Sequence, residues 1–576
     1  MSSHLQTAFL LLALGASICT RDFDLTVRGF AQAASSLVPI PKSDPLSVEG
    51  QSSLSAVIDG ATLLEMRWPD FKDYREDVAR FYDAYGDGLP WVRDMQPTSQ
   101  ARAAVALLLK ADEEGLSADD YDGPRWTERF SKLKPELQHP KESDAIKFDV
   151  ALTVSMMRYL SDLHIGKVNP QHPDFEIDIG DKKYRLPEFM KEQVVEGSDV
   201  TSIASRVEPP YPSYRRTIQA LRTYRQLAQQ DTYEVLPPIS RVVASGNLYQ
   251  GGPRLFHFLQ LIGDLPSGAV APTDSTIYQG ALVDAVKSFQ RRHGLTPDGQ
   301  IDANTLDALN ISLDRRVRQM QLTLERWRWL PSDYGHSAVV VNIPEFRLRA
   351  YDEQFHIGVT MNAVVGQAYG HHTPVFANKI RYVIFRPSWN VPPSIAREEI
   401  LPAIQRDPDY MAKEDLETVD SRGNVNAPAN ITPEILQQIQ SGALSIRQRP
   451  GPKNSLGLVK FMFPNEFDVY MHDTPITELF SRSRRDFSHG CIRLEKPAEL
   501  AEWVLRDNPD WTPERIRAAM DGEQTQEVAL THPIPVLIVY GTVVVLEDQI
   551  VHFYDDIYGL DGDLDRILDK GYPYGR

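Results

Sequence analysis

The chain contains very little cysteine: Cys19 and Cys491 are the two cysteines among its 576 residues. Cys19 lies in an N-terminal apolar segment of the kind that is removed on export, so Cys491 would stand alone in a processed chain. A lone cysteine forms no intramolecular disulfide, and a thiol without a function is open to oxidation in an oxidising compartment. Because an isolated cysteine is more often a small buried residue than a nucleophile, its neighbours must decide its role.

Long basic runs and long apolar runs are missing as well. The formal net charge is −18 and no extended run of Lys and Arg occurs, which argues against a nucleic-acid partner. No segment reaches the length of a membrane-spanning helix. The hydrophobic content of 42% and the charged content of 24% are typical of a soluble globular protein. A chain of this length exceeds one hydrophobic core, so we expect several domains.

The N-terminus has most features of an export segment. Ala8–Ile18 is an uninterrupted run of apolar or small residues with no charge before Arg21, about the length of a signal hydrophobic region. The first residues lack Lys and Arg, and Ala31-Gln32-Ala33 offers a cleavage site. We therefore predict that residues 1–34 form a signal or anchor segment and that the protein is exported to the periplasm or cell envelope. Cleavage, lipidation at Cys19 and retention as a membrane anchor all stay open.

A linker and a helical domain follow this segment. The first residues after it are rich in Ser and Pro, so we predict a linker over 35–65. From residue 66 to 235 the apolar residues recur at helical spacing, as Val150, Val154 and Met157 illustrate. No catalytic constellation occurs in this stretch, and we predict a helical scaffold domain over 66–235.

A small module is predicted over 242–312. Its periodicity indicates three helices, with Gly294 as a helix C-cap and Asp298-Gly299 as a tight turn. The string from Phe289 to Gly299, Phe-Gln-Arg-Arg-His-Gly-Leu-Thr-Pro-Asp-Gly, resembles the hallmark of the peptidoglycan-binding domain type 1 family. The resemblance implies binding to the cell-wall polymer, with a purely structural spacer as the alternative.

The pattern changes to β after a helical connector. We predict a mixed, β-sandwich-like domain over 335–550, with an inserted polar, helix-prone segment over about 395–450 and a C-terminal extension over 551–576. An insertion of this size in a sheet domain is usually a lid or a binding subdomain. The whole chain is therefore predicted to be an α+β multidomain protein. Strand-like patterns occur at 338–343, 346–351, 380–385, 458–463 and 468–471, with a hairpin at 536–546.

The residues that carry chemistry lie near the end of this domain. His472 follows a strand-like segment, and Ser488-His489-Gly490-Cys491-Ile492-Arg493 comes shortly after it. A thiol becomes a nucleophile when an imidazole takes its proton and nearby donors stabilise the oxyanion formed on attack. Glycine lets the backbone approach a carbonyl closely, so the amides of Gly490 and Cys491 are natural oxyanion donors.

This string resembles the catalytic motif of the YkuD-type L,D-transpeptidase family. The motif is a His, followed at a distance by Ser or Thr, His, Gly, Cys, a hydrophobic residue and Asn or Arg. His472 and the run from Ser488 to Arg493 supply every element, and Arg493 stands where many members have Asn. Together with the scaffold, the peptidoglycan-binding module and the insertion, the resemblance extends to the large YcbB-like subgroup.

The resemblance implies acyl transfer between peptide stems of peptidoglycan. Cys491 would attack the diaminopimelate carbonyl of a donor tetrapeptide and release its terminal D-alanine, and His472 would accept the thiol proton. The side-chain amine of an acceptor diaminopimelate would resolve the thioester into a 3→3 cross-link. Asp473 stands where the family orients its histidine through the next residue's backbone carbonyl, which leaves the role of its carboxylate open. No cofactor or metal is implied, because His371-His372 lacks the ligand spacing of a zinc site.

Several site residues keep alternative roles. His489 is a rival base, because side chains two residues apart share a face in an extended segment; the family pattern favours His472. Ser488 and Arg493 either bind a substrate carboxylate or brace the loop. The weaker substrate-binding candidates, for whose aromatic members core packing is the alternative, are Asn454, Trp389 and Tyr470.

Other functions fit parts of the same pattern. Water in place of the amine gives an L,D-carboxypeptidase, and a protein lysine in that place attaches proteins to the wall. A noncatalytic wall-binding scaffold is disfavoured by the intact Cys491 and His472. The insertion would act as a lid that restricts water and so favours the amine as acceptor.

Overall fold

The computed structural model describes most of the chain beyond residue 44. The predicted signal segment 1–34, with Cys19 and the predicted cleavage site, lies outside the described residues. Within the described ranges, no helix combines the length and the apolar character needed to cross a bilayer. These ranges are 45–134, 141–171, 175, 177, 179, 182, 184–271, 276–331, 337–426 and 431–574.

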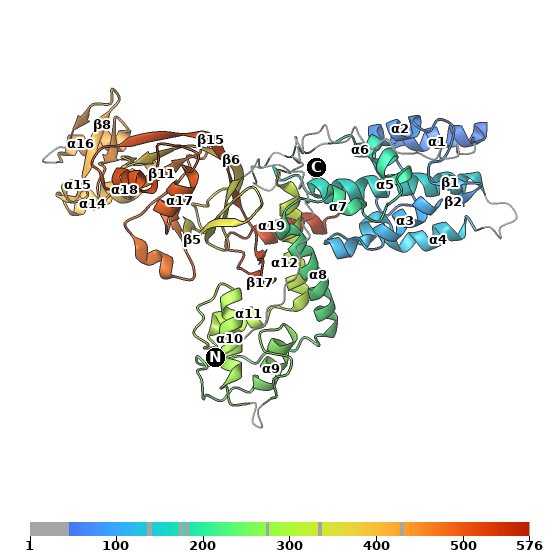
Figure 1. The fold of residues 1–576 in the computed structure, drawn as a ribbon, viewed down its shortest axis with the longest axis horizontal. Helices are drawn as coiled ribbons and strands as arrows, with labels where there is room; N and C mark the ends of the chain where they lie inside the picture. The colour runs from blue at the N-terminus through green and yellow to red at the C-terminus, as the bar shows by residue number, and fades with distance from the viewer. Residues whose placement is uncertain are drawn as a thin grey trace, which may run out of the picture. The chain divides into compact units, whose positions relative to one another are not determined.

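Helices dominate the first region, where they pack around one central helix (Figure 1). This helix, α5 (Glu142–Ile165), is buried along nearly all of its length from Ala145 to Leu163, because apolar residues occur on every side of it. The buried side chains of this region form a hydrophobic cluster of their own. The other elements are α1 (Val48–Gly60), η2 (Lys72–Tyr74), α2 (Arg75–Asp83), β1 (Val92–Arg93), β2 (Gln96–Pro97), α3 (Ser99–Leu108), η3 (Ala111–Glu114), η4 (Ala118–Tyr121), η5 (Gly123–Arg125), α4 (Trp126–Ser131), α6 (Leu186–Phe189), η7 (Met190–Val195) and α7 (Ile203–Val207).

Part of the segment predicted as a linker, 35–65, is helical instead. Helix α1 begins after Ser47, whose side chain accepts a hydrogen bond from the Gly50 amide at 3.0 Å. Leu54 and Ile58 of this helix are buried in the core of the helical region. Serine is common in linkers and is also a preferred N-cap residue, so composition alone does not reveal this helix.

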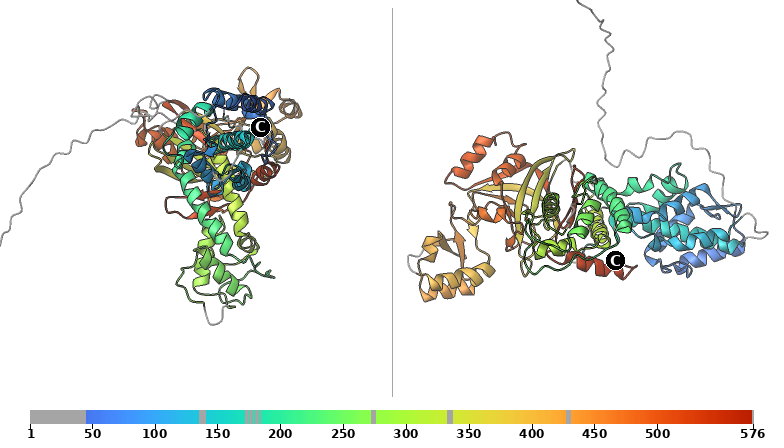
Figure 2. Two further views of the ribbon diagram at one scale, coloured as in Figure 1. Left: turned by 90° about the vertical axis from the view of Figure 1, so that its right-hand side faces the viewer. Right: turned by 90° about the horizontal axis from the view of Figure 1, so that it is seen from below.

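The small module contains the three predicted helices over its described residues: α9 (Gly252–Leu261), α10 (Ala281–Arg292) and α11 (Ala303–Leu309). Gly294 (φ +66°) and Gly299 (φ +74°) adopt left-handed conformations, as a helix end and a tight turn require. Helices α8 (Pro212–Gln230) and α12 (Leu313–Trp329) lie side by side and lead to and from the module (Figure 2).

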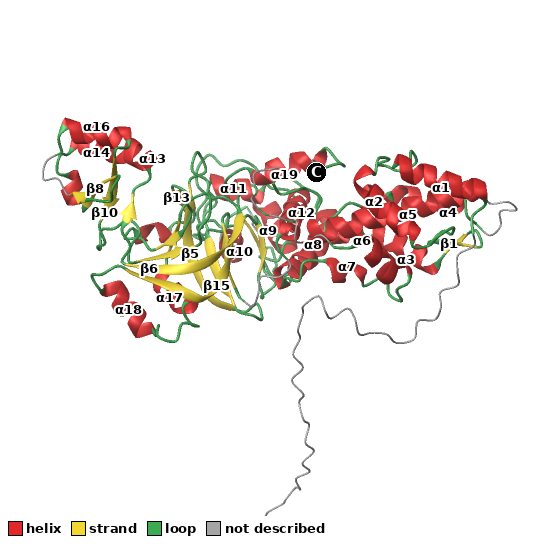
Figure 3. Ribbon diagram, turned by 90° about the horizontal axis from the view of Figure 1, so that it is seen from above, coloured by secondary structure: helices red, strands yellow, loops and turns green. Residues whose placement is uncertain are grey.

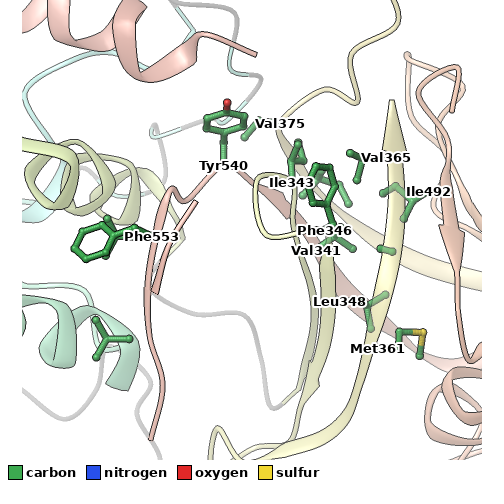
Figure 4. Close-up of a cluster of buried hydrophobic side chains, with 14 of the residues drawn as sticks. Val341, Ile343, Phe346, Leu348, Met361, Val365, Val375, Ile492, Tyr540 and Phe553 are labelled. Atoms are coloured by element: carbon green, nitrogen blue, oxygen red, sulfur yellow. The ribbon is translucent and has the colours of Figure 1, made fainter. Parts of the chain in front are cut away.

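The region beyond residue 337 contains a nine-stranded mixed sheet that closes on itself. The strand order among the described residues is β13-β5-β14-β12-β11-β6-β15-β3-β4, and β4 also pairs with β5. The sandwich-like layering expected from the sequence thus comes from one closed sheet, whose buried cluster includes Val341, Leu348, Met361 and Ile492 (Figure 4). Helical regions beside this sheet confirm the α+β class. The strands are β3 (Ala338–Asn342), β4 (Arg347–Tyr351), β5 (Ile357–Gly366), β6 (Phe376–Phe385), β11 (Val459–Met462), β12 (Met471–His472), β13 (Asp486–Ser488), β14 (Ile492–Leu494) and β15 (Gln526–Val539).

The hairpin predicted at 536–546 is wrong in its pairing. Strands β15 and β16 (Val543–Val545) flank a turn, as predicted, but they do not pair with each other. Strand β15 lies between β6 and β3, so both of its edges are occupied. Strand β16 pairs instead with β17 (Val551–Phe553).

The insertion forms a small unit with its own sheet and core. Its strands, in the order β7-β10-β8-β9, lie beside short helices (Figure 3), and a separate buried cluster includes Ile400, Ile404 and Ile446. The sequence predicts the helices but not this sheet. The elements are β7 (Trp389–Asn390), α13 (Pro393–Ile395), η8 (Ala396–Ile400), α14 (Leu401–Arg406), α15 (Tyr410–Lys413), β8 (Leu416–Asp420), β9 (Val425–Asn426), α16 (Pro433–Ser441) and β10 (Leu444–Gln448).

The C-terminal extension returns to the helical region. Helix α19 (Leu560–Asp569) contacts α12, where Arg326 forms an ion pair with Asp561. Beyond it, Tyr572 lies under Arg158 of α5, with the guanidinium carbon 4.1 Å from the ring centroid. The chain end therefore links the sheet region to the first helical region. The remaining elements are η9 (Thr477–Ser481), α17 (Pro497–Val504) and α18 (Pro513–Asp521).

Asp149 is a carboxyl group buried in the helical core, with no cation in salt-bridge contact among the described residues. It accepts hydrogen bonds from the Tyr82 hydroxyl at 2.6 Å and from the Trp91 amide at 2.8 Å. Burial disfavours its charged form more than these bonds favour it, and raises the pKa of Asp149 to about 7.

When the pH rises from 5 to 8, we expect the free energy of unfolding to fall more in the wild type than in the Asp149→Asn variant. The difference between the two decreases should be roughly 2 kcal/mol. The folded-state pKa lies above the unfolded value of about 3.9, so this group stabilises the fold most below pH 4. That contribution is lost as the pH rises through about 7. Urea unfolding followed by circular dichroism at both pH values measures the difference; the same pH dependence in both proteins would contradict it.

Candidate active site

Three neighbouring strands place the candidate site on one face of the sheet. Lys460 of β11 pairs with His472 of β12, and His472 pairs with Arg493 of β14. Met471 and Ile492, the residues next to them, are fully buried in the core. Because side chains alternate between the two faces of a strand, Lys460, His472 and Arg493 form a row on the face opposite this core.

Cys491 and Tyr470 belong to the same face. Each lies two residues before a member of the row, and the amide of Ile492 donates to the Tyr470 carbonyl at 3.0 Å. Alternation therefore puts the Cys491 thiol beside Tyr470 and diagonal to His472. Cys491 is a free, partly exposed cysteine, whereas His472 is 4% exposed. The register thus places the predicted nucleophile and the predicted base on the same face of neighbouring strands, and the Cys491 sulfur lies 3.8 Å from the Asp468 carbonyl oxygen.

The imidazole of His472 is held in one tautomer. Its Nδ1 lies 2.5 Å from the backbone carbonyl oxygen of Asp473, and a carbonyl can only accept, so Nδ1 carries the proton. No hydrogen-bond partner of Nε2 is found among the described residues. The Nε2 lone pair is therefore free to accept a proton.

Electrostatics keep this imidazole neutral at rest. Burial lowers the pKa of His472 to about 3, and the charges of Arg493 and Lys460 lower it further in the same direction. Burial also raises the pKa of the Cys491 thiol, while hydrogen bonds from Tyr470 and the two cations oppose that effect. The resting pair is a neutral thiol and a neutral imidazole, and the flanking cations favour a thiolate over an imidazolium.

The Asp473 carboxylate binds backbone amides of the surrounding loops and not the imidazole of His472. It accepts hydrogen bonds from the amides of Leu458 at 2.8 Å and Thr474 at 2.7 Å. It also packs against Gly457 (φ +61°), where a Cβ would lie 2.3 Å from one carboxylate oxygen. The backbone carbonyl of Asp473, in contrast, holds His472.

The turn before Cys491 is braced by Ser488. The Ser488 hydroxyl donates to the Cys491 carbonyl at 2.5 Å and accepts from the Gly490 amide at 3.2 Å. Gly490 has φ +110°, and its carbonyl accepts from the Thr373 hydroxyl at 2.7 Å. The Gly490 amide, expected as an oxyanion donor, is therefore occupied by Ser488. The Cys491 amide has no acceptor among the described residues and stays available.

His489, the rival base, is turned to the insertion. Its Nε2 lies 2.7 Å from a carboxylate oxygen of Glu399 in η8, and its ring centroid is 4.6 Å from that of His371. This ion-pair geometry occupies the nitrogen that a base would need. The same contact places the insertion next to the turn that carries Cys491.

Tyr470 and Trp389 form hydrogen bonds at the candidate site, so packing in the core, the alternative role for them, is not their only one. Burial, and after it the charge of Cys491 and a hydrogen bond to its sulfur, raise the pKa of Tyr470, while a hydrogen bond from Trp389 opposes the rise. The ammonium nitrogen of Lys460 lies 3.5 Å from the centroid of the Tyr470 ring, a cation–π contact. Sequence reasoning misses Lys460; its signal is a lysine in the otherwise apolar strand β11.

The other two substrate-binding candidates differ from each other. Asn454 is 1% exposed, and its amide nitrogen donates to three backbone carbonyls at both ends of the insertion. Its side chain therefore fixes the base of the insertion and is not available to a substrate. Arg493 has no acidic partner within salt-bridge distance among the described residues, so it leaves an unpaired cation beside Cys491 for an anionic group.

Three segments of the chain match known domain families. Residues 76–221 match the "Scaffold domain", residues 258–309 the "Putative peptidoglycan binding domain" and residues 336–545 the "L,D-transpeptidase catalytic domain". A curated relative from Haemophilus influenzae, "Putative L,D-transpeptidase", is 32% identical over 245 residues, which are 42% of this chain and 48% of the relative. The chain therefore spans about half the length of this relative.

The candidate site falls inside the third matched segment, since Lys460, His472, Cys491 and Arg493 all lie between residues 336 and 545. The resemblance noted in the sequence is confirmed in each of its three parts. The chain carries a scaffold domain, a peptidoglycan-binding type 1 domain and an L,D-transpeptidase catalytic domain of the YkuD family.

Proposed function

We propose that this protein is a peptidoglycan L,D-transpeptidase that forms 3→3 cross-links between peptide stems through a thioester on Cys491. The observation that carries the proposal is the strand register, which places a free cysteine diagonal to a neutral imidazole in a row with two cations, with no partner for the imidazole Nε2 among the described residues. We also propose that the protein acts in the periplasm, as an exported or membrane-anchored enzyme of the cell envelope.

In the first half-reaction the Cys491 sulfur attacks the diaminopimelate carbonyl of a donor tetrapeptide. His472 Nε2 takes the thiol proton as the carbon–sulfur bond forms, and the Cys491 amide donates to the resulting oxyanion. Collapse of this intermediate breaks the bond to the terminal D-alanine, whose amine receives the proton from His472. The products are free D-alanine and a thioester.

In the second half-reaction the diaminopimelate amine of another stem attacks the thioester. The amine gives a proton to His472 Nε2 as the new carbon–nitrogen bond forms. Collapse then breaks the carbon–sulfur bond, and the sulfur recovers its proton. A 3→3 amide is formed and the resting thiol and imidazole are restored.

The two cations suit both the sulfur and the substrate. Lys460 and Arg493 stabilise negative charge on the thiolate, and the unpaired guanidinium of Arg493 can bind a stem carboxylate in a bidentate manner. Tyr470 holds the sulfur, and Trp389 holds Tyr470. Arg493 is thereby proposed to bind substrate, while Ser488 braces the turn.

The insertion is proposed to act as a lid that favours the amine over water. It reaches the catalytic turn through the contact of Glu399 with His489, and its first strand supplies Trp389. A thioester open to bulk solvent is hydrolysed, so restricting water favours transfer. Without this restriction the same thioester would give an L,D-carboxypeptidase.

We expect Cys491→Ala to abolish every product from disaccharide-tetrapeptide, because it removes the attacking sulfur. The matched control is Cys19→Ser, which should leave the products unchanged. Liquid chromatography with mass spectrometry identifies the cross-linked dimer and the tripeptide, and circular dichroism checks the fold. Product formation by folded Cys491→Ala would sink the mechanism, and tripeptide without dimer from the wild type would favour the carboxypeptidase.

Replacement of Lys460 by Met should slow alkylation of Cys491 by iodoacetamide roughly 3- to 10-fold at pH 8, because the reactive thiolate loses a neighbouring cation. Loss of the cation raises the pKa of the thiol further, so the whole rate profile should move to higher pH. Both variants also carry Cys19→Ser, so that Cys491 is the one thiol that can be alkylated. The control variant is Lys379→Met, at an exposed site on β6. Unchanged pH profiles in both variants would show that Lys460 does not act on the thiol.

Glu399→Gln should lower the ratio of cross-linked dimer to hydrolysed tripeptide several-fold, because it removes the charge that pairs with His489 at the lid contact. Its neighbour Glu398→Gln, exposed and without an ion-pair partner among the described residues, is the matched control. Total thioester turnover should stay near the wild-type level in both. An unchanged ratio in Glu399→Gln would remove this contact from the control of acceptor choice.

A further inference from the structure

A groove of about 370 Å³ lies between the peptidoglycan-binding module and the catalytic domain. One wall is the loop Arg291–Pro297, at the end of α10, and the opposite wall is the loop Phe480–Arg485, which leads into β13. Strand β13 in turn ends at the turn that carries Cys491. The groove therefore joins the module to the loop that precedes the proposed nucleophile.

The family hallmark of the module is largely used for packing. Phe289 stacks on His293 at 3.7 Å between ring centroids, and His293 stacks on Phe553 of β17 at 5.5 Å. The Gln290 side chain binds within the module, to the Gly299 amide at 2.8 Å and the Gln300 carbonyl at 2.8 Å. Of this string, the residues that line the groove are Arg291 and the segment His293 to Pro297.

The groove carries an excess of positive charge, although the chain as a whole has a net charge of −18. Arg291 and Arg482 are exposed and have no acidic partner within salt-bridge distance among the described residues. Arg485 is 8% exposed and donates to the Phe346 carbonyl at 3.1 Å and the Asn362 side-chain oxygen at 3.3 Å. Its Nε has no partner, and no carboxylate pairs with it within the described ranges.

The acidic groups nearby do not cancel this charge. Glu345 lines the groove, but both of its oxygens are taken by Arg349, one at 2.7 Å and the other at 2.5 Å. Asp555 is the other carboxylate in the lining. Burial, and after it the charge of Arg347, lower the pKa of Arg485 to about 10.

We infer that this groove binds the carboxylates of a peptide stem of the cell-wall polymer, as a subsite built jointly by the module and the catalytic domain. The inference rests on the proposed function. Stem peptides carry several carboxylates, and arginine forks recognise carboxylates through paired, charge-assisted hydrogen bonds. A stem held here is tethered next to the loop that leads to Cys491, which raises the local concentration of the polymer at the catalytic turn.

Binding of disaccharide-tetrapeptide to the full chain carrying Cys491→Ala tests this subsite. The exposed pair Arg291→Ala and Arg482→Ala avoids the buried Arg485, and the pair Arg381→Ala and Arg422→Ala, at exposed sites away from the groove, is the control. We expect at least about 10-fold weaker binding by the groove variant, from loss of two charge-assisted contacts, and no change in the control.

A second probe, the same muropeptide with its carboxylates amidated, isolates the carboxylate contacts. Amidation should weaken binding to the control protein more than to the groove variant, because the coupling between arginines and carboxylates is lost once either partner is removed. The inference would be overturned if amidation weakened binding equally in the control protein and in the groove variant. It would also be overturned if these two proteins bound the unmodified muropeptide equally well.

The proposed function is tested separately in chains that keep Cys491. The groove variant should still form the thioester at saturating disaccharide-tetrapeptide, with the concentration for half-saturation raised. Groove binding without any thioester in the wild type would contradict the transpeptidase proposal and leave the subsite. Thioester formation by the groove variant with an unchanged concentration for half-saturation would support the transpeptidase proposal and contradict the subsite.

Discussion

The pairing of β12 with β11 on one edge and with β14 on the other determines the chemistry of the site. This register places the imidazole of His472 between Lys460 and Arg493, where burial and two positive charges lower its pKa and keep it neutral at rest. The Asp473 carbonyl fixes the tautomer, so the basic nitrogen is Nε2. A shift of one residue in this register would move His472 into the hydrophobic core.

The surrounding parts act on this row from three directions. The turn braced by Ser488 presents Cys491 beside Tyr470. The insertion reaches the same turn through the ion pair between Glu399 and His489. Pairing within the closed sheet holds the three strands in register. The charges fit the anionic substrate that we propose. Although the chain is acidic, Arg493 at the site and Arg291 and Arg482 in the groove have no acidic partner within salt-bridge distance in the part of the chain that the structure describes.

Local patterns in the sequence predict the helical regions, most strands and the three domain families, because periodicity and motif strings are local properties. The pairing of β16 with β17 and the sheet of the insertion depend on contacts between distant segments, which periodicity does not contain. The same holds for the site. The motif indicates Cys491 and His472, but the position of Lys460 follows only from strand register, and the use of Asn454 as a brace follows only from its three backbone acceptors.

The central claim is that Cys491 carries the acyl group of the donor stem. Rapid acid quenching of the wild-type protein with disaccharide-tetrapeptide, followed by peptide mapping in a mass spectrometer, tests it most directly. We predict an adduct on the peptide that contains Cys491, with the mass of the substrate minus D-alanine. An adduct on another residue, or cross-linked product formed while Cys491 is never modified, would contradict the claim.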